Sequence, residues 1–252
     1  MSASGVLQGK RALITGGSRG LGRALGIAFA RAGARVAFTY SRSTADADDA
    51  AALITKAVPG AEAPLVFKGS VADAKHVSET VAALNRAWGG VDILVNCAAL
   101  TQVLPIALLE EEDWDRVMDV NVKGVYLFSR AVLRGMIRAK SGHILNIGSF
   151  ASERIVDAPV HYAASKSALR GLTEALAREV GRYGIAVNLL APGLLDVGLG
   201  QMLLPHRIAE YLSQCPAGRL GSADELAELA VFLVSDANRF MTGAKIVVDG
   251  GL

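Results

Sequence analysis

The chain has 252 residues, of which 52% are hydrophobic and 27 are glycine, and its 26 Lys and Arg residues nearly balance 24 Asp and Glu residues to a net charge of +2. This size and composition suit an α/β protein with a buried core and many tight turns. The near-neutral charge, without basic runs, argues against nucleic acid as a partner.

Cysteine content and the lengths of the apolar runs indicate the compartment. The two cysteines, Cys97 and Cys215, are too few and too far apart for a disulfide framework, which favours a reducing compartment. The first ten residues lack the apolar stretch of a signal peptide. No segment reaches the roughly 18 consecutive apolar residues of a membrane span. We therefore expect a cytoplasmic protein with no membrane partner.

The predicted elements alternate between strand and helix along the chain. Short apolar runs indicate strands buried on both faces, and longer runs with helical spacing separate them. The predicted strands are 11–15, 35–40, 64–68, 91–95, 143–147, 185–190 and 245–248, and the predicted helices are 20–32, 46–57, 73–88, 160–183 and 223–234, with a further long helix inside 111–138. This order predicts a doubly wound Rossmann-like α/β fold, with a seven-stranded parallel sheet and helices on both faces.

No linker, repeat or low-complexity tract divides the chain, so we expect a single domain over residues 1–252. Residues 195–215 form an insertion punctuated by Gly198, Gly200 and Pro205. Such a segment suits a mobile substrate lid, although a purely structural connection is an open alternative.

The first predicted strand runs into a glycine-rich turn, Thr15–Gly22 (TGGSRGLG), which opens a helix. Glycines let the chain turn sharply and let backbone N–H groups approach a pyrophosphate at the positive end of that helix. The spacing is TGxxxGxG rather than GxGxxG, and a tight structural turn is the alternative. Its place after the first strand of a βαβ unit favours a dinucleotide site.

The end of the second strand indicates which dinucleotide binds. An NAD site usually carries an acid about 20 residues after the glycines, but here no acid precedes Asp46. Arg19 and Arg42 are placed to flank an extra 2′-phosphate, with Ser41 donating a hydrogen bond. Ordinary surface charges are the alternative reading of the two arginines. The pattern favours NADPH/NADP+.

Tyr162 and Lys166 lie four residues apart on one face of a predicted helix. A free tyrosine has a pKa near ~10, and both an ammonium and an oxidised nicotinamide favour its phenolate. Ser149 follows the strand 143–147, at the carboxyl edge where ligands collect in such sheets, and its hydroxyl is placed to bond a substrate oxygen. A packing role for the Tyr–Lys pair is the alternative.

Taken together, the motifs resemble those of the short-chain dehydrogenase/reductase family over essentially the whole chain. The resemblance rests on the TGxxxGxG turn, Asn121, Ser149, Tyr162, Lys166 and the segment from Asn188 to Pro192-Gly193. Within that family, the stretches 177–180, 216–221 and 248–251 are similar to those of 3-oxoacyl-[acyl-carrier-protein] reductases.

The resemblance implies that the protein reduces a ketone to a secondary alcohol with hydride from NADPH. In that scheme Tyr162 donates a proton to the carbonyl oxygen and Ser149 orients the carbonyl. Lys166 lowers the Tyr162 pKa and holds the nicotinamide ribose, and Asn121 keeps a water in a proton relay to Lys166. The implied cofactor residues are Thr15, Gly16, Ser18, Arg19, Gly20, Leu21, Gly22, Tyr40, Ser41, Arg42, Ser70, Val71, Asn96, Ala98, Tyr162, Lys166, Pro192 and Gly193.

Three positions depart from the family pattern. The usual Asn-Asn-Ala-Gly reads Asn96-Cys97-Ala98-Ala99, which adds a methyl group near the cofactor. Val197 stands where the family commonly has Thr, and Ser70 replaces a frequent Asp. None of these positions carries the proton transfer, so we expect activity.

The resemblance makes a 3-oxoacyl thioester, on acyl carrier protein or CoA, the expected substrate. Lys140 and Arg182 fall where such reductases present basic residues to an acidic carrier protein, although any solvated helix end carries such charges. A small free ketone or alcohol is an alternative substrate. A non-catalytic NADP(H)-binding regulator is a further alternative, against which the complete catalytic set argues.

Surplus apolar positions on the helices within 111–138 and 160–183 predict that these helices pair between subunits, and the family resemblance implies that they do so across a two-fold axis and form a homotetramer. Ordinary core packing also accounts for such positions. The four histidines are scattered with no acid cluster nearby, so we expect no metal site.

Overall fold

The computed structural model describes residues 5–252, without the side chains of residues 199 and 202. Its centre is a seven-stranded sheet in which every pairing is parallel, in the order β3-β2-β1-β4-β5-β6-β7. The strands are β1 (Arg11–Thr15), β2 (Arg35–Tyr40), β3 (Leu65–Lys68), β4 (Ile93–Asn96), β5 (Gly142–Ile147), β6 (Ile185–Pro192) and β7 (Lys245–Val248). The predicted fold class is confirmed.

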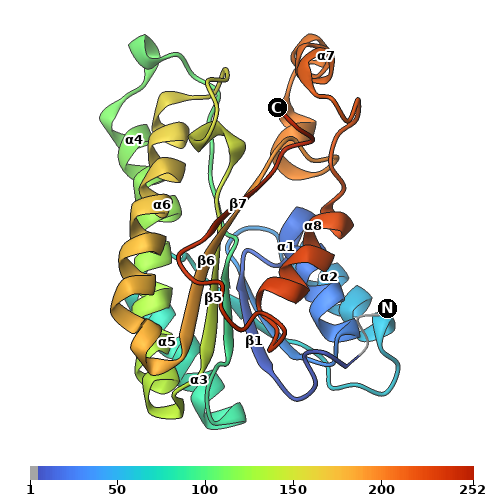
Figure 1. The fold of residues 1–252 in the computed structure, drawn as a ribbon, viewed down its shortest axis with the longest axis vertical. Coiled ribbons are helices and arrows are strands. Elements are labelled where there is room, and N and C mark those ends of the chain that lie inside the picture. Colours follow the sequence, from blue (N-terminus) through green and yellow to red (C-terminus); the bar gives the residue numbers. More distant parts are fainter. Residues whose placement is uncertain (1–4) are drawn as a thin grey trace.

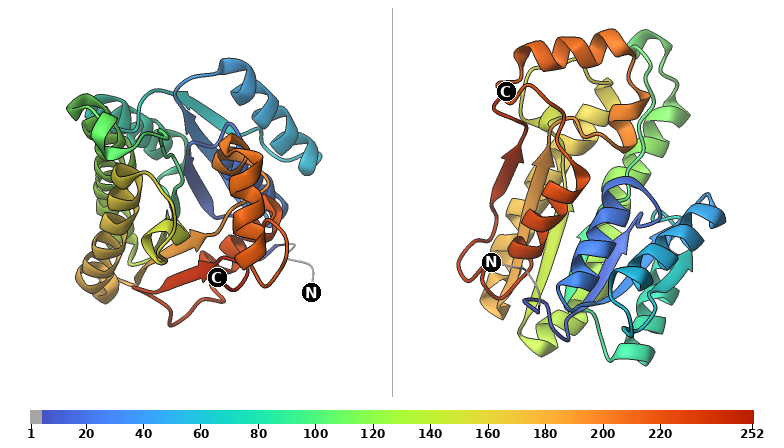
Figure 2. Two further views of the ribbon diagram at one scale, coloured as in Figure 1. Left: turned by 90° about the horizontal axis from the view of Figure 1, so that it is seen from above. Right: turned by 90° about the vertical axis from the view of Figure 1, so that its right-hand side faces the viewer.

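Helices cover both faces of the sheet, as Figure 1 shows. On one face lie α1 (Gly20–Arg31), α2 (Thr44–Ala57) and α8 (Ala223–Leu233). On the other lie α3 (Ala74–Trp88), α4 (Glu111–Met118), α5 (Gly124–Ala139) and α6 (Val160–Val180). A further helix, α7 (Pro205–Gln214), lies beyond the carboxyl end of β7 in both the front and side views (Figures 1 and 2).

Successive side chains of the buried strands point to opposite faces of the sheet and so contribute to two hydrophobic cores, one on each face. In β1, Ala12 and Ile14 pack with α1, α2 and α8, whereas Leu13 between them packs with α3 and α5. Phe29 of α1 and Phe128 of α5 are fully buried on the opposite faces. Burial of apolar surface on both sides of each central strand therefore holds the sheet between the helices.

The strand order places a crevice between β1 and β4. Chain connections leave β1 toward β2 on one side and reach β4 on the other, so the carboxyl ends of these two strands form the topological switch point. Ligands of open α/β sheets bind in this position. Any site built from the ends of β1, β4 and β5 therefore opens on this edge.

Several element boundaries differ from the sequence predictions. The helix predicted inside 111–138 is α4 and α5 joined by a π-helical segment, η2 (Asp119–Lys123). The predicted helix 160–183 ends as the 3₁₀ turn η4 (Gly181–Tyr183), and β6 runs two residues beyond its predicted end, to Pro192. Within 195–215 the structure adds the 3₁₀ segment η5 (Gly198–Met202) and the helix α7, which Pro205 begins.

Candidate active site at the carboxyl edge of the sheet

Several glycines of the turn after β1 have no room for a side chain. A Cβ on Gly17 would overlap the Phe38 side chain, and one on Gly22 would overlap the backbone carbonyl of Gly16. Gly16 and Gly20 also have positive φ angles of 71° and 54°. Because only glycine fits these positions, the backbone stays bare on the side that faces the crevice.

The start of α1 suits an anion. Arg19 occupies the N-cap position but makes no side-chain cap, and the first turn contains no acidic residue. The first N–H groups of a helix need outside acceptors, and a pyrophosphate supplies them. The Thr15 hydroxyl accepts hydrogen bonds from the backbone N–H groups of Cys97 (3.0 Å) and Ala98 (3.1 Å), which ties this turn to the end of β4. The residues present therefore fit a dinucleotide.

Positive charge gathers around the end of β2. Arg19 and Arg42 are exposed, and neither forms an ion pair with any residue in 5–252. Tyr40 is buried, and its hydroxyl donates to Thr44 (3.3 Å) at the start of α2. Ser41 is exposed beside Arg42.

Lys68 is a third cation at this place, and no sequence motif marks it. The pairing of β2 with β3 sets Lys68 opposite Tyr40, and its ammonium lies 6.0 Å from the centre of the Tyr40 ring. It also lies 3.4 Å from the Thr44 hydroxyl. The register between β2 and β3 places Lys68 near the end of β2, which Arg42 follows. No local sequence motif predicts this register.

Tyr162, Lys166 and Ser149 converge where β5 ends. The Lys166 ammonium donates to the carbonyl of Ile147, the last residue of β5, at 2.8 Å, and lies 5.7 Å from the centre of the Tyr162 ring. The Ser149 side chain interacts with the Tyr162 phenol and lowers its pKa. Lys166 and Ser149 are buried, and Tyr162 is half-buried. One turn of α6 and the end of β5 thus bring the three side chains to one point.

Burial controls the protonation of the pair. It raises the pKa of Tyr162 to about 12, and the hydrogen bond with Ser149 opposes only part of this rise. Burial also lowers the pKa of Lys166 to about 8. The sequence predicts that the ammonium depresses the tyrosine pKa; in the structure desolvation is the larger effect. The phenol is therefore protonated at neutral pH, which is the form that donates a proton.

Asn121 lies in the π-helical segment, and its amide makes three hydrogen bonds. Its Oδ1 accepts from the backbone N–H of Leu100 (2.7 Å), and its Nδ2 donates to the Leu100 carbonyl (2.9 Å) and to the Ser165 hydroxyl (2.9 Å). Both amide protons are used, so this side chain fixes the loop after β4 against α6. Segments of the π type, which interrupt regular helical hydrogen bonding, frequently occur at functional sites.

The side chain of Asn96 points into a buried polar network. Its Nδ2 donates to Asn146 (2.8 Å) and lies 3.2 Å from the Ser129 hydroxyl, and Asn146 in turn donates to Thr173 (2.9 Å). This network joins β4 and β5 to α5 and α6. Any contact of Asn96 with a cofactor would therefore involve its backbone.

The remaining predicted cofactor residues border the same crevice. Ala98 abuts Gly16, Val71 is buried against Gly124, and Pro192-Gly193 ends β6. The exposed Ser70 hydroxyl accepts from the N–H of Ala72. The other members, Ser18 and Leu21, are half-buried in the glycine-rich turn and the first turn of α1.

The basic residues assigned to a carrier protein lie at the other edge. Lys140 caps the C-terminus of α5 just before β5, and Arg182 lies in η4 just before β6. Both therefore sit near the amino ends of strands whose carboxyl ends carry Ser149 and Pro192. A strand rises about 3.3 Å per residue, so the length of β5 separates Lys140 from Ser149 by roughly 20 Å.

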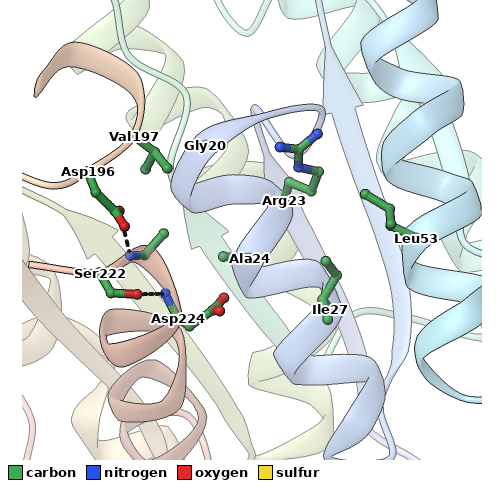
Figure 3. Close-up of a pocket in the computed structure, with 10 residues that line it drawn as sticks. Gly20, Arg23, Ala24, Ile27, Leu53, Asp196, Val197, Ser222 and Asp224 are labelled. Atoms are coloured by element: carbon green, nitrogen blue, oxygen red, sulfur yellow. Dashed lines mark hydrogen bonds between the residues drawn. The ribbon is translucent and has the colours of Figure 1, made fainter. Parts of the chain in front are cut away.

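A pocket of about 280 Å³ flanks the glycine-rich turn on the α1 and α8 side (Figure 3). Val197 closes it near Gly20, and Asp196 accepts from the N–H of Ala223 at the start of α8 (3.3 Å). Its lining residues are Gly20, Arg23, Ala24, Ile27, Leu53, Asp196, Val197, Ser222, Ala223 and Asp224. None of these is Ser149, Tyr162 or Lys166, so the pocket adjoins the cofactor turn rather than the catalytic point.

Between residues 5 and 252 no three His, Cys, Asp or Glu side chains are arranged to hold a metal ion. Over the same residues no helix combines the length and apolarity needed to cross a bilayer.

Comparison with known sequences places this site in context. A family model described as enoyl-(acyl carrier protein) reductase matches residues 16–252. The chain is 38% identical over 246 residues to the 3-oxoacyl-[acyl-carrier-protein] reductase FabG of Pseudomonas aeruginosa, with 98% of each chain covered. It is 35% identical over 245 residues to the Escherichia coli protein of the same name, covering 97% of this chain and 98% of the relative.

Solved structures give the same picture. A mutant of a Serratia marcescens short-chain dehydrogenase/reductase superposes with a TM-score of 0.90 at 36% identity, covering 97% of this chain and 98% of the other. A short-chain type dehydrogenase/reductase from Mycobacterium marinum superposes with a TM-score of 0.88 at 32% identity, covering 99% and 96%.

Proposed function

Because the chain belongs to the short-chain dehydrogenase/reductase family, we propose that it reduces a ketone to a secondary alcohol with NADPH. It is an oxidoreductase acting on CH–OH or C=O groups, and the family uses nicotinamide cofactors. The observation that carries the proposal is the convergence of Tyr162, Lys166 and Ser149 at the carboxyl edge, beside a glycine-rich turn that fits a pyrophosphate.

Each residue has a defined task in the proposed reaction. Ser149 donates a hydrogen bond to the substrate carbonyl and orients it. The protonated phenol of Tyr162 gives its proton to that oxygen as the carbonyl carbon is reduced. Lys166, held by the Ile147 carbonyl, places positive charge beside the phenolate that this transfer leaves. The bound cofactor supplies the hydride.

The charge at the β2 end supports NADPH as the cofactor. The 2′-phosphate would be held by Arg42 and Arg19, with Lys68 beside them, and no acid occupies the place that usually binds a free 2′-hydroxyl. The glycine-rich turn would hold the pyrophosphate. Lys166 would also bind the nicotinamide ribose.

We propose a 3-oxoacyl thioester as the substrate, since full-length relatives are named for reducing this group on acyl carrier protein. One observation favours a second candidate, a small free ketone. Lys140 and Arg182 lie at the opposite edge from Tyr162, whereas the segment nearer the site begins α4 with Glu111, Glu112 and Asp113. An acidic carrier would be repelled by those carboxylates.

A substrate panel tests the proposal. NADPH oxidation would be followed with acetoacetyl thioesters of acyl carrier protein and CoA, and with free ketones of similar size. We expect turnover of at least one of these classes, and a carrier preference would show as a higher kcat/KM for the protein-bound thioester. NADPH binding without oxidation across the whole panel would contradict an enzymatic role.

We also propose a single domain whose segment 195–215 covers the substrate, and a homotetramer that pairs through α4, α5 and α6. Trp114 and Tyr126 are large side chains that remain 37% and 49% exposed on α4 and α5, as an unoccupied pairing face would leave them. A monomeric mass in sedimentation would contradict the pairing.

A further inference from the structure

The loop that follows Ser149 is tied to both ends of β7 by two neighbouring charged residues. This serine loop, residues 150–159, leads from Ser149 to the start of α6. Glu153 forms an ion pair with Lys245, the first residue of β7. Arg154 pairs through its Nε with Asp249, which directly follows β7, at 3.1 Å. The loop is thus fixed at two points along one strand.

Both carboxylates of these pairs are nearly inaccessible. The side chains of Glu153 and Asp249 are 4% and 6% exposed, whereas their partners Lys245 and Arg154 reach solvent. A buried carboxylate without a cation is strongly unfavourable, so each acid holds its partner in place. The Ser152 hydroxyl continues the contact toward the site, because it lies 2.7 Å from the Ser149 carbonyl and 3.1 Å from the Glu153 carboxylate.

Asp249 also joins this loop to α7. Its backbone carbonyl accepts from the Tyr211 hydroxyl of α7 (3.0 Å), and that hydroxyl accepts from the N–H of Leu194 (3.3 Å). The Tyr211 ring packs edge-on against Phe150, the residue after Ser149, with centroids 5.6 Å apart. A second link runs from Arg207 of α7 to Asp157 of the serine loop.

Tyr211 and Asp249 also pack against Gly193, which follows β6 at the carboxyl edge of the sheet. A Cβ on Gly193 would lie 2.5 Å from the Tyr211 hydroxyl oxygen and 2.8 Å from the Asp249 Cα, so these groups close directly on Gly193. Asp249 is therefore the point where the serine loop, α7 and the end of β6 meet. Among residues 5–252, Arg154 is the side chain of the serine loop that forms an ion pair with this point.

We propose that Arg154 is a positioning residue: through Asp249 it fixes Ser149 relative to Tyr162 and holds α7 over the site. The inference rests on the proposed role of Ser149 in orienting a carbonyl. Loss of the guanidinium leaves the buried Asp249 carboxylate without its cation, and the serine loop then loses one of its two anchors on β7. Catalysis that depends on the Ser149 hydroxyl should suffer, whereas the glycine-rich turn on the far side of the crevice is untouched.

The first test replaces Arg154 by Met, which keeps length and removes charge. We expect kcat to fall about 10- to 100-fold, as for a catalytic group displaced by a fraction of an ångström to one ångström, with NADPH affinity unchanged. Arg154→Lys should recover part of the loss. Arg35→Met is the matched control, since Arg35 is also a half-exposed arginine in an ion pair, with Glu62, but lies at the amino end of β2.

A double-mutant cycle separates positioning from general damage to the fold. If Arg154 acts through Ser149, Arg154→Met should cost less than about twofold in a Ser149→Ala background, because non-additivity marks residues that act together. Equal losses in the two backgrounds, or full activity of Arg154→Met alone, would overturn the proposal.

Hydrogen exchange supplies a readout that does not need turnover. In Arg154→Met, the backbone amides of residues 149–154 and those of α7 should both exchange faster than in the wild type. The amides of α1 should exchange at the wild-type rate. Unchanged exchange in residues 149–154 and in α7 would overturn the proposal. A wild-type protein that reduces no carbonyl would instead contradict the proposed function, so the two failures are distinct.

Discussion

Tyr162, which is half-buried, and Lys166, which is buried, both have shifted pKa values in the proposed active site. Tyr162, with a pKa of about 12, keeps its proton through the whole physiological range, and Lys166, with a pKa of about 8, is the group that titrates within it. A hydroxyl that must give up a proton to a developing alkoxide benefits from a neighbouring positive charge. If Lys166 has the proposed role, its charge rather than that of the phenol is expected to set the upper limit of the active pH range.

The pH profile of reduction tests this assignment. Below pH 8 Lys166 is charged and the rate should be level, and above pH 8 kcat/KM should fall about tenfold per pH unit as the ammonium is lost. Unfolding is not the cause in this range, because the Lys166 pKa is lower in the folded chain than its ordinary value of 10.5. The unfolded chain thus binds more protons between these values, and this lysine makes the protein more stable as pH rises. A level rate up to pH 10 would be the contrary result.

Arg42 is the residue that best tests whether the end of β2 binds the cofactor 2′-phosphate. Arg42→Asp puts a carboxylate where the phosphate would lie and offers an acceptor to a free 2′-hydroxyl, so the ratio of kcat/KM for NADPH to that for NADH should fall at least about tenfold. Steady-state kinetics with both cofactors measure it. Arg86→Asp, an exposed arginine on α3, is the control. An equal ratio in Arg42→Asp and the wild type would show that the phosphate is bound elsewhere.

At the scale of elements, the turn between β1 and α1 is the least tolerant part of the site. Gly22→Ala forces a methyl group against the Gly16 carbonyl, whereas Gly135→Ala, inside α5, meets nothing within 4 Å. We expect Gly22→Ala to lower the free energy of unfolding by about 1–3 kcal/mol and to weaken NADPH binding. The control Gly135→Ala should raise the free energy of unfolding by about 0.5–1 kcal/mol, because alanine is more favourable than glycine inside a helix. Chemical denaturation and NADPH titration measure both, and a Gly22→Ala protein with wild-type values would contradict the description of the turn.

The same elements show what the sequence could and could not predict. Buried strands and the glycine-rich turn carry strong local signals, so the sheet and the position of this turn were predictable; its cofactor role stays a prediction. The π-helical segment between α4 and α5 was not predicted; it contains Asn121, whose side chain bonds to Leu100 and Ser165 from distant parts of the chain. Lys68 lies beside the end of β2 because of the register between β2 and β3. Arg154 contacts Asp249, which is 95 residues away in the sequence. Contacts of this kind have no signature in one sequence.

At the scale of the whole molecule, every proposed catalytic group lies on one edge of one sheet. The order of the strands brings the ends of β1, β4, β5 and β6 to that edge, and α7 lies beyond it (Figures 1 and 2). The opposite edge carries Lys140 and Arg182. A carrier protein bound there would have to serve the site of another subunit, which makes the assembly state relevant to the choice between thioester and free ketone.

The most direct measurement is the reduction rate of Tyr162→Phe beside its NADPH dissociation constant. This substitution removes one oxygen atom, the proposed proton donor, and leaves the ring and the lysine in place. We predict that kcat falls by about 10²–10⁴, the range of general acid catalysis, while NADPH binding changes less than about twofold. Turnover by Tyr162→Phe at the wild-type rate would contradict the account.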